Sequence, residues 1–149
     1  MPNVAVVYGS KSDEGIMKDA FDILEEFGVE YYTVVMSAHR QPEKTAEFAR
    51  SASTKGIKVI IAGAGLSAAL PGVIASYTIL PVIGVPISGG ALNGVDALYS
   101  IVQMPKGIPV ATVGISNARN AALLALEILA LSDKRIATQL EEYRHKNAS

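Results

Sequence analysis

The sequence predicts an α/β fold built around a parallel sheet, and two observations support it. Short β-branched runs alternate along the chain with stretches whose apolar residues recur at helical spacing. Repeated strand–helix–strand units of this kind form a parallel sheet with right-handed crossovers and helices on both faces. A chain of 149 residues, half of it apolar, can bury one substantial core, so we expect residues 1–149 to form one domain.

The number of strand-like runs narrows the fold further. The expected strands are Val4–Tyr8, Val29–Val35, Ile57–Ala62, Pro81–Val85 and Pro109–Val113. Five parallel strands with intervening helices predict a flavodoxin-like, doubly wound, three-layer sandwich. A ligand of such a fold lies beyond the carboxyl ends of the strands, near the switch in strand order, so the loops at that edge carry any site.

The expected helices differ in the apolar surface that they carry. A helix ending at Gly28 covers one sheet face, and a second runs from Pro42 to about Gly56 with a charged outer face. The run 118–131 is apolar nearly all round and must be buried, either inside the domain or, as we favour, against another subunit. A C-terminal helix is expected at about 132–146, with Ser132 and Asp133 as a possible N-cap pair.

Composition excludes several classes of function. A net charge of -1 provides no basic surface for nucleic acid, and without cysteine there is no disulfide, thiolate nucleophile or Cys-based metal site. The apolar stretches are interrupted before the roughly 20 residues that span a bilayer, and no signal peptide is recognisable. We expect a soluble cytoplasmic protein without a metal, and its apolar excess predicts an oligomer.

The loop after the first strand reads Gly9-Ser10-Lys11-Ser12-Asp13. A glycine that permits close approach, two hydroxyl groups and a following helix N-terminus are typical of a phosphate cradle. The alternative is that Ser12 or Asp13 only caps the helix.

The second strand is followed by Ser37-Ala38-His39-Arg40. Arginine binds phosphate or carboxylate with a rigid fork, and histidine carries a proton near neutral pH, so this pair predicts an anchor beside an acid/base group. A structural histidine is the alternative for His39, and we expect His145 to be only solvated.

Glycines follow the third and fourth strands. The segment 62–72 nominally matches a dinucleotide fingerprint, but no acidic residue follows about 20 positions later, so we expect these glycines to admit a smaller ligand. The segment 88–94 could close over the site or be a plain connection. A receiver-type domain lacks its acceptor Asp after the third strand, and a flavin carrier lacks aromatic rings beyond Tyr8.

Four motifs together resemble the N5-carboxyaminoimidazole ribonucleotide mutase family, the class I phosphoribosylaminoimidazole carboxylase catalytic subunits. They are the segments 9–13, 37–40, 62–65 and 100–105. The resemblance covers essentially the whole chain and implies a flavodoxin-like, cofactor-free homo-octamer. It also implies an isomerase of purine (IMP) biosynthesis that moves a carboxylate from the exocyclic nitrogen of aminoimidazole ribonucleotide to ring carbon C4.

The resemblance also implies roles for individual residues. His39 would shuttle the proton as the carbamate loses CO2 and C4 recaptures it. The ribose phosphate would be held by Ser10, Ser12, Asp13 and Arg40. The CO2 pocket would be lined by Ser37, Ala38, Gly63, Ala64 and Gly65.

Two alternatives to the mutase remain open. A second branch of the family is a carboxy-lyase that adds free CO2 directly, typically with Lys after the His and an Arg-Ser-Asn turn, and Arg40 and Ala64-Gly65 favour the mutase branch instead. However, Ala69 stands where the mutase branch usually has a His. A distant alternative is a non-catalytic nucleotide-binding relative.

Overall fold

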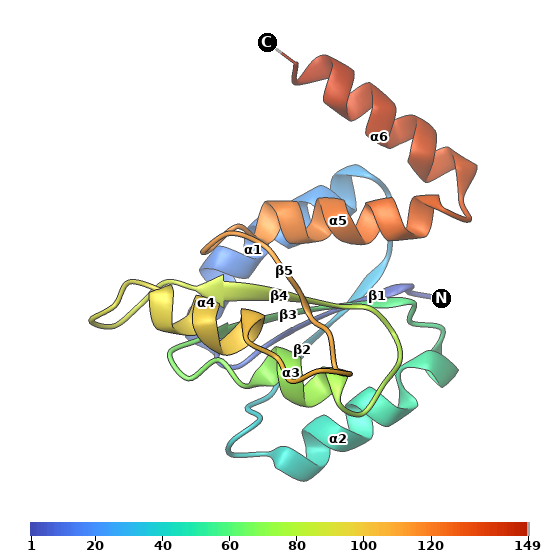
Figure 1. The fold of residues 1–149 in the computed structure, drawn as a ribbon. Helices are drawn as coiled ribbons and strands as arrows, with labels where there is room; N and C mark the ends of the chain where they lie inside the picture. Colours follow the sequence, from blue (N-terminus) through green and yellow to red (C-terminus); the bar gives the residue numbers. More distant parts are fainter. Residues whose placement is uncertain (149) are drawn as a thin grey trace.

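A computed structural model describes residues 1–148 and contains one sheet of five parallel strands in the order β2-β1-β3-β4-β5 (Figure 1). The predicted flavodoxin-like sheet is therefore confirmed. The strands are β1 (Val4–Tyr8), β2 (Tyr31–Val35), β3 (Val59–Gly65), β4 (Val82–Ile87) and β5 (Ala111–Thr112). β1 lies between β2 and β3, so the strand order reverses at β1 and β3.

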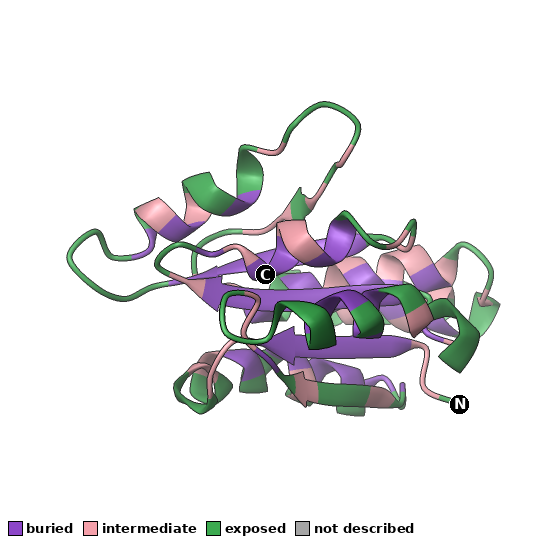
Figure 2. Cartoon of the chain, turned by 90° about the horizontal axis from the view of Figure 1, so that it is seen from below, coloured by how far each residue is buried: buried purple, intermediate pink, exposed green. Residues whose placement is uncertain are grey.

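Helices cover both faces of the sheet and make the three layers (Figure 1). The helices are α1 (Glu14–Glu26), α2 (Pro42–Ser51), α3 (Leu70–Ala75), α4 (Val95–Val102), α5 (Ala118–Ala130) and α6 (Lys134–Lys146). Alternate residues of β1 point to opposite faces: Val4 and Val6 pack with α1 and α5, whereas Ala5 and Val7 pack with α2 and α3. Figure 2 shows that the buried residues gather in the central strands.

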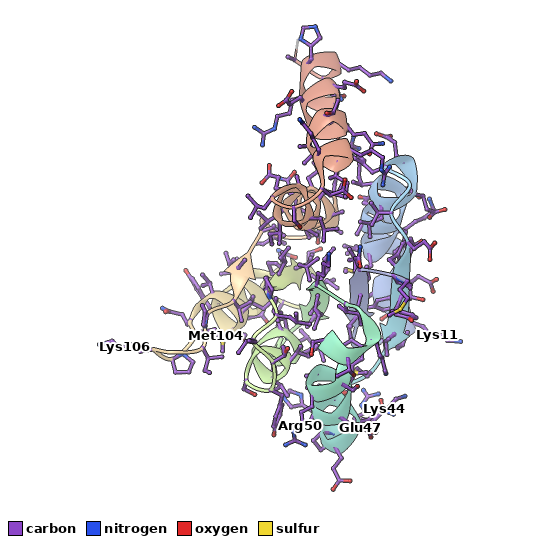
Figure 3. The ribbon with its side chains drawn as sticks, turned by 90° about the vertical axis from the view of Figure 1, so that its right-hand side faces the viewer. Lys11, Lys44, Glu47, Arg50, Met104 and Lys106 are labelled. Atoms are coloured by element: carbon purple, nitrogen blue, oxygen red, sulfur yellow. The ribbon has the colours of Figure 1, made fainter. Side chains whose placement is uncertain are left out.

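The outer face of α2 is charged, as predicted. Glu43, Lys44, Glu47 and Arg50 are exposed, and Figure 3 shows the last three on the side of α2 that faces away from the sheet. The Arg50 guanidinium lies 4.6 Å from the centroid of the Tyr77 ring, which links α2 to the segment after α3.

The third strand is longer than predicted. We expected it to end at Ala62 and leave Gly63–Gly65 in a loop, but β3 continues to Gly65. The reason is the length of β4, whose Pro86 and Ile87 pair with Ala64 and Gly65. Gly63 and Gly65 thus lie in the paired part of the sheet, where the missing side chain of Gly63 lets α1 approach closely.

Helix α5 is buried by its own chain, so the subunit contact that we favoured is not needed to explain its composition. Its alanines allow close packing on α1, and Ala122, Ala125 and Leu126 are completely buried. The outer side of α5 is partly covered by α6, which explains why few polar residues occur on it. Burial inside the domain, the alternative that we also considered, accounts for the buried face of α5.

Helix α6 forms where the capping residues predicted it. The Asp133 carboxylate accepts hydrogen bonds from the backbone N–H groups of Arg135 and Ile136, at 3.0 and 3.3 Å. The helix packs on α5 through Ile136 and Leu140, and its Tyr143 hydroxyl accepts two hydrogen bonds from Arg119. Within residues 1–148 no helix has the length and apolarity needed to cross a membrane.

Candidate functional site

A cleft of about 640 Å³ lies at the carboxyl ends of the four strands β1 to β4. Tyr8 and Val35 end β1 and β2 at the same level, and β3 and β4 continue two residues further, to Gly65 and Ile87, so all four loops leave the sheet at one edge. This is the switch point at which a doubly wound sheet binds its ligand. Most predicted site residues line the cleft: Ser10, Ser12, Asp13, Ser37, Ala38, His39, Arg40, Ala64 and Gly65.

The loop after β1 presents its hydroxyl groups to this cleft. The Ser10 and Ser12 hydroxyl oxygens lie 2.7 Å apart and share a hydrogen bond. Neither Ser10 nor Asp13 makes a side-chain capping hydrogen bond, although each occupies an N-cap position. Helix capping by the Asp13 side chain therefore does not explain this loop, whose polar side chains bond to one another at the edge of the cleft.

Asp13 is the one carboxylate that lines the cleft, and it is half-buried. Burial raises the pKa of its carboxyl group above the ordinary value, and hydrogen bonds from Ser10 and the Gly9 backbone offset only part of this effect. A partly desolvated acceptor of this kind gains most from a ligand that donates hydrogen bonds, such as a sugar hydroxyl.

His39 and Arg40 lie on the turn between β2 and α2, with both side chains exposed at the cleft. The Arg40 backbone N–H donates to the Ser37 hydroxyl at 3.2 Å, so the Ser37 side chain supports this turn as well as lining the cleft. An imidazole, a guanidinium and five serine residues thus share one cleft with Asp13. The arrangement can bind an anionic ligand and exchange a proton with it.

Gly63 does not line the cleft, contrary to our expectation. It is buried beneath α1, where an added Cβ would lie 2.5 Å from the Met17 sulfur and 3.1 Å from the Ile87 Cδ1 atom. The physical reason is the alternation of strand residues: Gly63 faces α1, whereas the end of the strand opens into the cleft. Gly63 therefore determines how closely α1 approaches the sheet.

The segment after β4 forms one rim of the cleft through Ser88, Gly89 and Gly90. Gly90 has a φ of +67°, and a side chain there would meet the Leu66 Cδ2 atom at 2.8 Å. Leu66 itself adopts a left-handed backbone with a φ of +51°, which is unusual for leucine and typical of functional sites. The Ser88 backbone N–H donates to the Ser116 hydroxyl at 3.0 Å, which connects this rim to the start of α5.

Sequence reasoning did not identify Ile16 as an apolar wall of the cleft. The available signal was its position three residues after Asp13, which places both on one face of α1.

Ala69, which stands where the mutase branch usually has a histidine, also lines the cleft. The cleft therefore lacks a second imidazole at this position. The fourth motif lies outside the cleft: it covers the end of α4, and Met104 packs over Gly72.

A second hollow, of about 690 Å³, lies at the opposite edge of the sheet. It is bounded by the segments 75–82 and 107–109 and has no charged residue in its lining. Unlike the cleft at the carboxyl edge, this hollow therefore offers no charged side chain to a ligand.

The sequence description of the AIR carboxylase family matches residues 3–149, almost the full chain. The chain belongs to the AIR carboxylase family. A Pyrococcus abyssi relative called N5-carboxyaminoimidazole ribonucleotide mutase is 59% identical over 144 residues, which cover 97% of this chain and 83% of that protein.

Two further family members add to the comparison. A Saccharomyces cerevisiae protein called phosphoribosylaminoimidazole carboxylase is 51% identical over 142 residues, covering 95% of this chain but only 25% of its own. The crystal structure of Treponema denticola PurE superposes with a TM-score of 0.90 at 34% identity, covering 99% of this chain and 92% of that one. The family fold is therefore shared well beyond close sequence relatives.

Proposed function

We propose that this chain is an N5-carboxyaminoimidazole ribonucleotide mutase, an isomerase of purine biosynthesis. The observation that carries the proposal is the cleft, where His39 and Arg40 face the loop of Ser10 and Asp13 across the switch point of the sheet. Family membership and the name of the Pyrococcus abyssi relative support the same reaction.

The ligand's ribose phosphate would lie between the loops after β1 and β2. The Arg40 fork and the hydroxyls of Ser10 and Ser12 suit phosphate oxygens, since both kinds of group can donate hydrogen bonds. The Asp13 carboxylate can only accept when ionised, so it suits the ribose hydroxyls. The aminoimidazole ring would then extend toward His39.

The reaction needs a proton carrier because one proton must move from carbon to nitrogen. The bond between the exocyclic nitrogen and the carboxylate breaks, CO2 leaves, and the nitrogen gains a proton. The C4 electron pair then attacks the same CO2, and C4 loses its proton once the new carbon–carbon bond has formed. In this proposal His39 delivers the first proton and removes the second, so no net proton is consumed.

CO2 must stay beside the ring between the two steps. Ser37, Ala38, Ala64 and Gly65 line the cleft with small side chains, which leaves room for a linear triatomic molecule. We propose that these residues form the CO2 pocket, and that no cofactor takes part, since the substrate carries all the atoms that the product needs.

A carboxylase that uses free CO2 is the second candidate. Ala69 in the cleft, and the carboxylase name of the Saccharomyces cerevisiae relative, favour it. The first of these matters because the mutase branch that this chain resembles usually has a second imidazole at that position.

Turnover measurements distinguish the two. Purified protein is given either the N5-carboxylated ribonucleotide or aminoimidazole ribonucleotide with bicarbonate, and formation of the C4 carboxylate is followed. Strong preference for the carbamate is expected. Efficient use of free CO2 alone would assign the carboxylase instead, and no turnover of either would leave a nucleotide-binding protein.

We also propose that the chain works as a homo-octamer in the cytoplasm. Large apolar side chains remain exposed on the single chain, among them Ile79, Tyr99, Val102 and Leu131. Their burial between copies would account for the apolar composition now that α5 is covered internally. Light scattering that finds a monomer would contradict the octamer.

A further inference from the structure

Gln41 is the last residue of the turn that carries His39 and Arg40, and it is hydrogen-bonded to Ser37, the first residue, through both its backbone and its side chain. The Gln41 backbone N–H donates to the Ser37 carbonyl at 2.8 Å. In the opposite direction, the Ser37 backbone N–H donates to the Gln41 side-chain oxygen Oε1 at 3.3 Å. With the Arg40 N–H bonded to the Ser37 hydroxyl, three hydrogen bonds hold this five-residue turn.

Gln41 is in turn fixed to helix α2. Its carbonyl oxygen accepts hydrogen bonds from both the backbone N–H and the hydroxyl of Thr45, at 3.1 and 2.9 Å. Thr45 is fully buried and is the only buried polar side chain within residues 1–148. A buried hydroxyl with a satisfied hydrogen bond is costly to displace, so Gln41 is held against a rigid element.

The side chains at the tip of the turn have no comparable support. Across residues 1–148, the His39 imidazole and the Arg40 guanidinium make no side-chain hydrogen bond or ion pair. Their direction is therefore determined by the backbone of the turn. The Ser37 N–H lies two residues after the end of β2 and would lose its partner if the Gln41 amide were removed.

We propose that Gln41 is a positioning residue: its side-chain oxygen holds the Ser37–Gln41 turn so that His39 points into the cleft. The inference rests on the proposed function, because it assigns to His39 the proton transfers of that reaction. It adds a residue that does not itself line the cleft. Catalytic geometry is sensitive to small displacements, so loss of one hydrogen bond outside the site can slow the chemical step.

Two variants of nearly equal size separate this role from packing. Gln41→Met keeps the length of the side chain but removes the acceptor, and Gln41→Glu keeps the acceptor oxygen. We expect Gln41→Met to lower kcat by about 5- to 20-fold, the range that one lost hydrogen bond of about 1 to 1.8 kcal/mol produces. Gln41→Glu should remain within about threefold of wild type and keep the wild-type Tm, whereas Gln41→Met should lower the Tm by only a few degrees and stay folded.

The decisive measurement combines Gln41→Met with His39→Asn. If Gln41 acts through His39, the double variant turns over no more slowly than His39→Asn alone, because there is no imidazole left to position. Equal fractional losses of kcat in both backgrounds would overturn the proposal. An unchanged kcat in Gln41→Met alone would also overturn it.

Amide exchange provides a readout that does not need turnover. The Ser37 N–H should exchange slowly in wild type and in Gln41→Glu, and much faster in Gln41→Met, whereas the Met36 N–H, bonded to Tyr8, should not change. If wild type lacks activity on either substrate, the proposed reaction fails, and the exchange result still decides whether Gln41 holds the turn. Equal exchange rates of the Ser37 N–H in wild type and Gln41→Met would show that the Gln41 side chain does not hold the turn.

Discussion

The sulfur of Met17 occupies the space that a side chain on Gly63 would need. An ideal Cβ on Gly63 would lie 2.5 Å from this sulfur, and Met17 is completely buried. The contact joins the centre of the sheet to α1, the helix that follows the Ser10–Asp13 loop. Close packing of α1 on β3 therefore places that loop at the cleft.

Gly63→Ala should destabilise the fold by roughly 1–3 kcal/mol, the usual cost of an added methyl group in a packed core. Urea denaturation measures this. Gly15→Ala is the matched control, since nothing lies within 4 Å of a Cβ there. Gly15 is in α1, so that substitution should stabilise the helix by about 0.5–1 kcal/mol.

Combining Gly63→Ala with Met17→Ala tests the contact itself. Met17→Ala opens space in the core, so the two costs should be less than additive. If Gly63→Ala has wild-type stability, or if the costs simply add, α1 is not held by this contact.

His39→Asn should reduce kcat by about 10²- to 10⁴-fold, the usual contribution of a general acid/base group. Substrate binding, measured by calorimetry, should change much less because Arg40 and the serines remain. His145→Asn is the internal control, since His145 lies exposed near the end of α6. The kcat of this variant should equal that of wild type. Full activity in His39→Asn would remove His39 from the mechanism.

Asp13→Asn should raise the stability of the protein at pH 7 and lower its activity. Burial raises the native pKa of this carboxyl group above its ordinary 3.8, so folding favours the protonated form. The stability that Asp13 contributes is fully present below pH 3.8 and is lost as the pH rises through the native pKa. A neutral amide avoids that loss, so the variant should have the higher Tm at pH 7, with the difference shrinking in acid.

The same variant should lose about 10- to 100-fold in kcat/KM, because a hydrogen bond to a charged group is worth about 1.5–3 kcal/mol. A variant that is less stable than wild type at pH 7 would show that the carboxylate is stabilised in the free protein, contrary to its environment.

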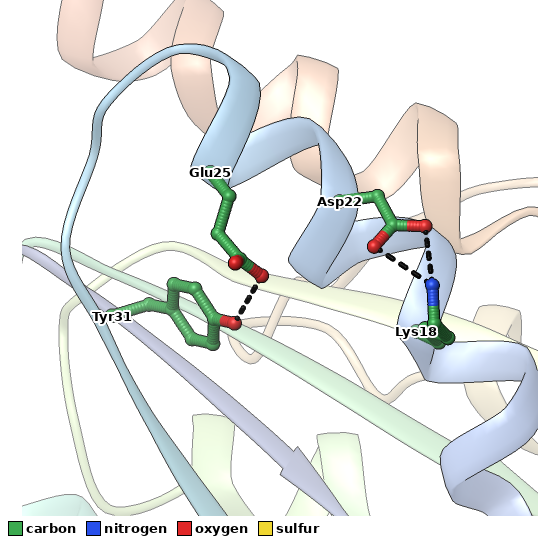
Figure 4. Close-up of polar contacts among 4 residues, drawn as sticks. All are labelled: Lys18, Asp22, Glu25 and Tyr31. Atoms are coloured by element: carbon green, nitrogen blue, oxygen red, sulfur yellow. Dashed lines mark hydrogen bonds and ion pairs between the residues drawn. The ribbon is translucent and has the colours of Figure 1, made fainter.

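Tyr31 provides a prediction away from the cleft. Its hydroxyl donates to the Glu25 carboxylate at 2.9 Å (Figure 4), and burial together with this bond raises the pKa of Tyr31 to about 12. Stability from this group is complete below pH 10 and is lost as the pH rises toward 12. Ultraviolet titration of wild type and Tyr31→Phe should assign the late transition to Tyr31.

At pH 7, Tyr31→Phe should cost about 0.5 kcal/mol, the low end for a hydrogen bond near solvent. The neighbouring Lys18–Asp22 ion pair is exposed, so Lys18→Met should leave the Tm unchanged (Figure 4). A Tyr31 that ionises near pH 10 would contradict the contact with Glu25.

The number of strands and the loops that line the cleft were predictable because local patterns carry them. β-branched runs of five to seven residues mark the strands, and parallel strands bring every following loop to one edge. Ser10, Asp13, His39 and Arg40 each follow such a run, so their meeting in one cleft required only the topology.

Other features depended on contacts between distant segments. The burial of 118–130 inside the chain was decided by α1 and α6, since an apolar run has the same pattern whichever surface covers it. The family resemblance assigned Gly63 to the CO2 pocket, but pairing with β4 keeps Gly63 inside the strand, where it faces α1. The hydrogen bond from Ser37 to the Gln41 side chain likewise has no pattern in the sequence. Periodicity records which residues avoid water, but only the folded chain determines which surface they meet.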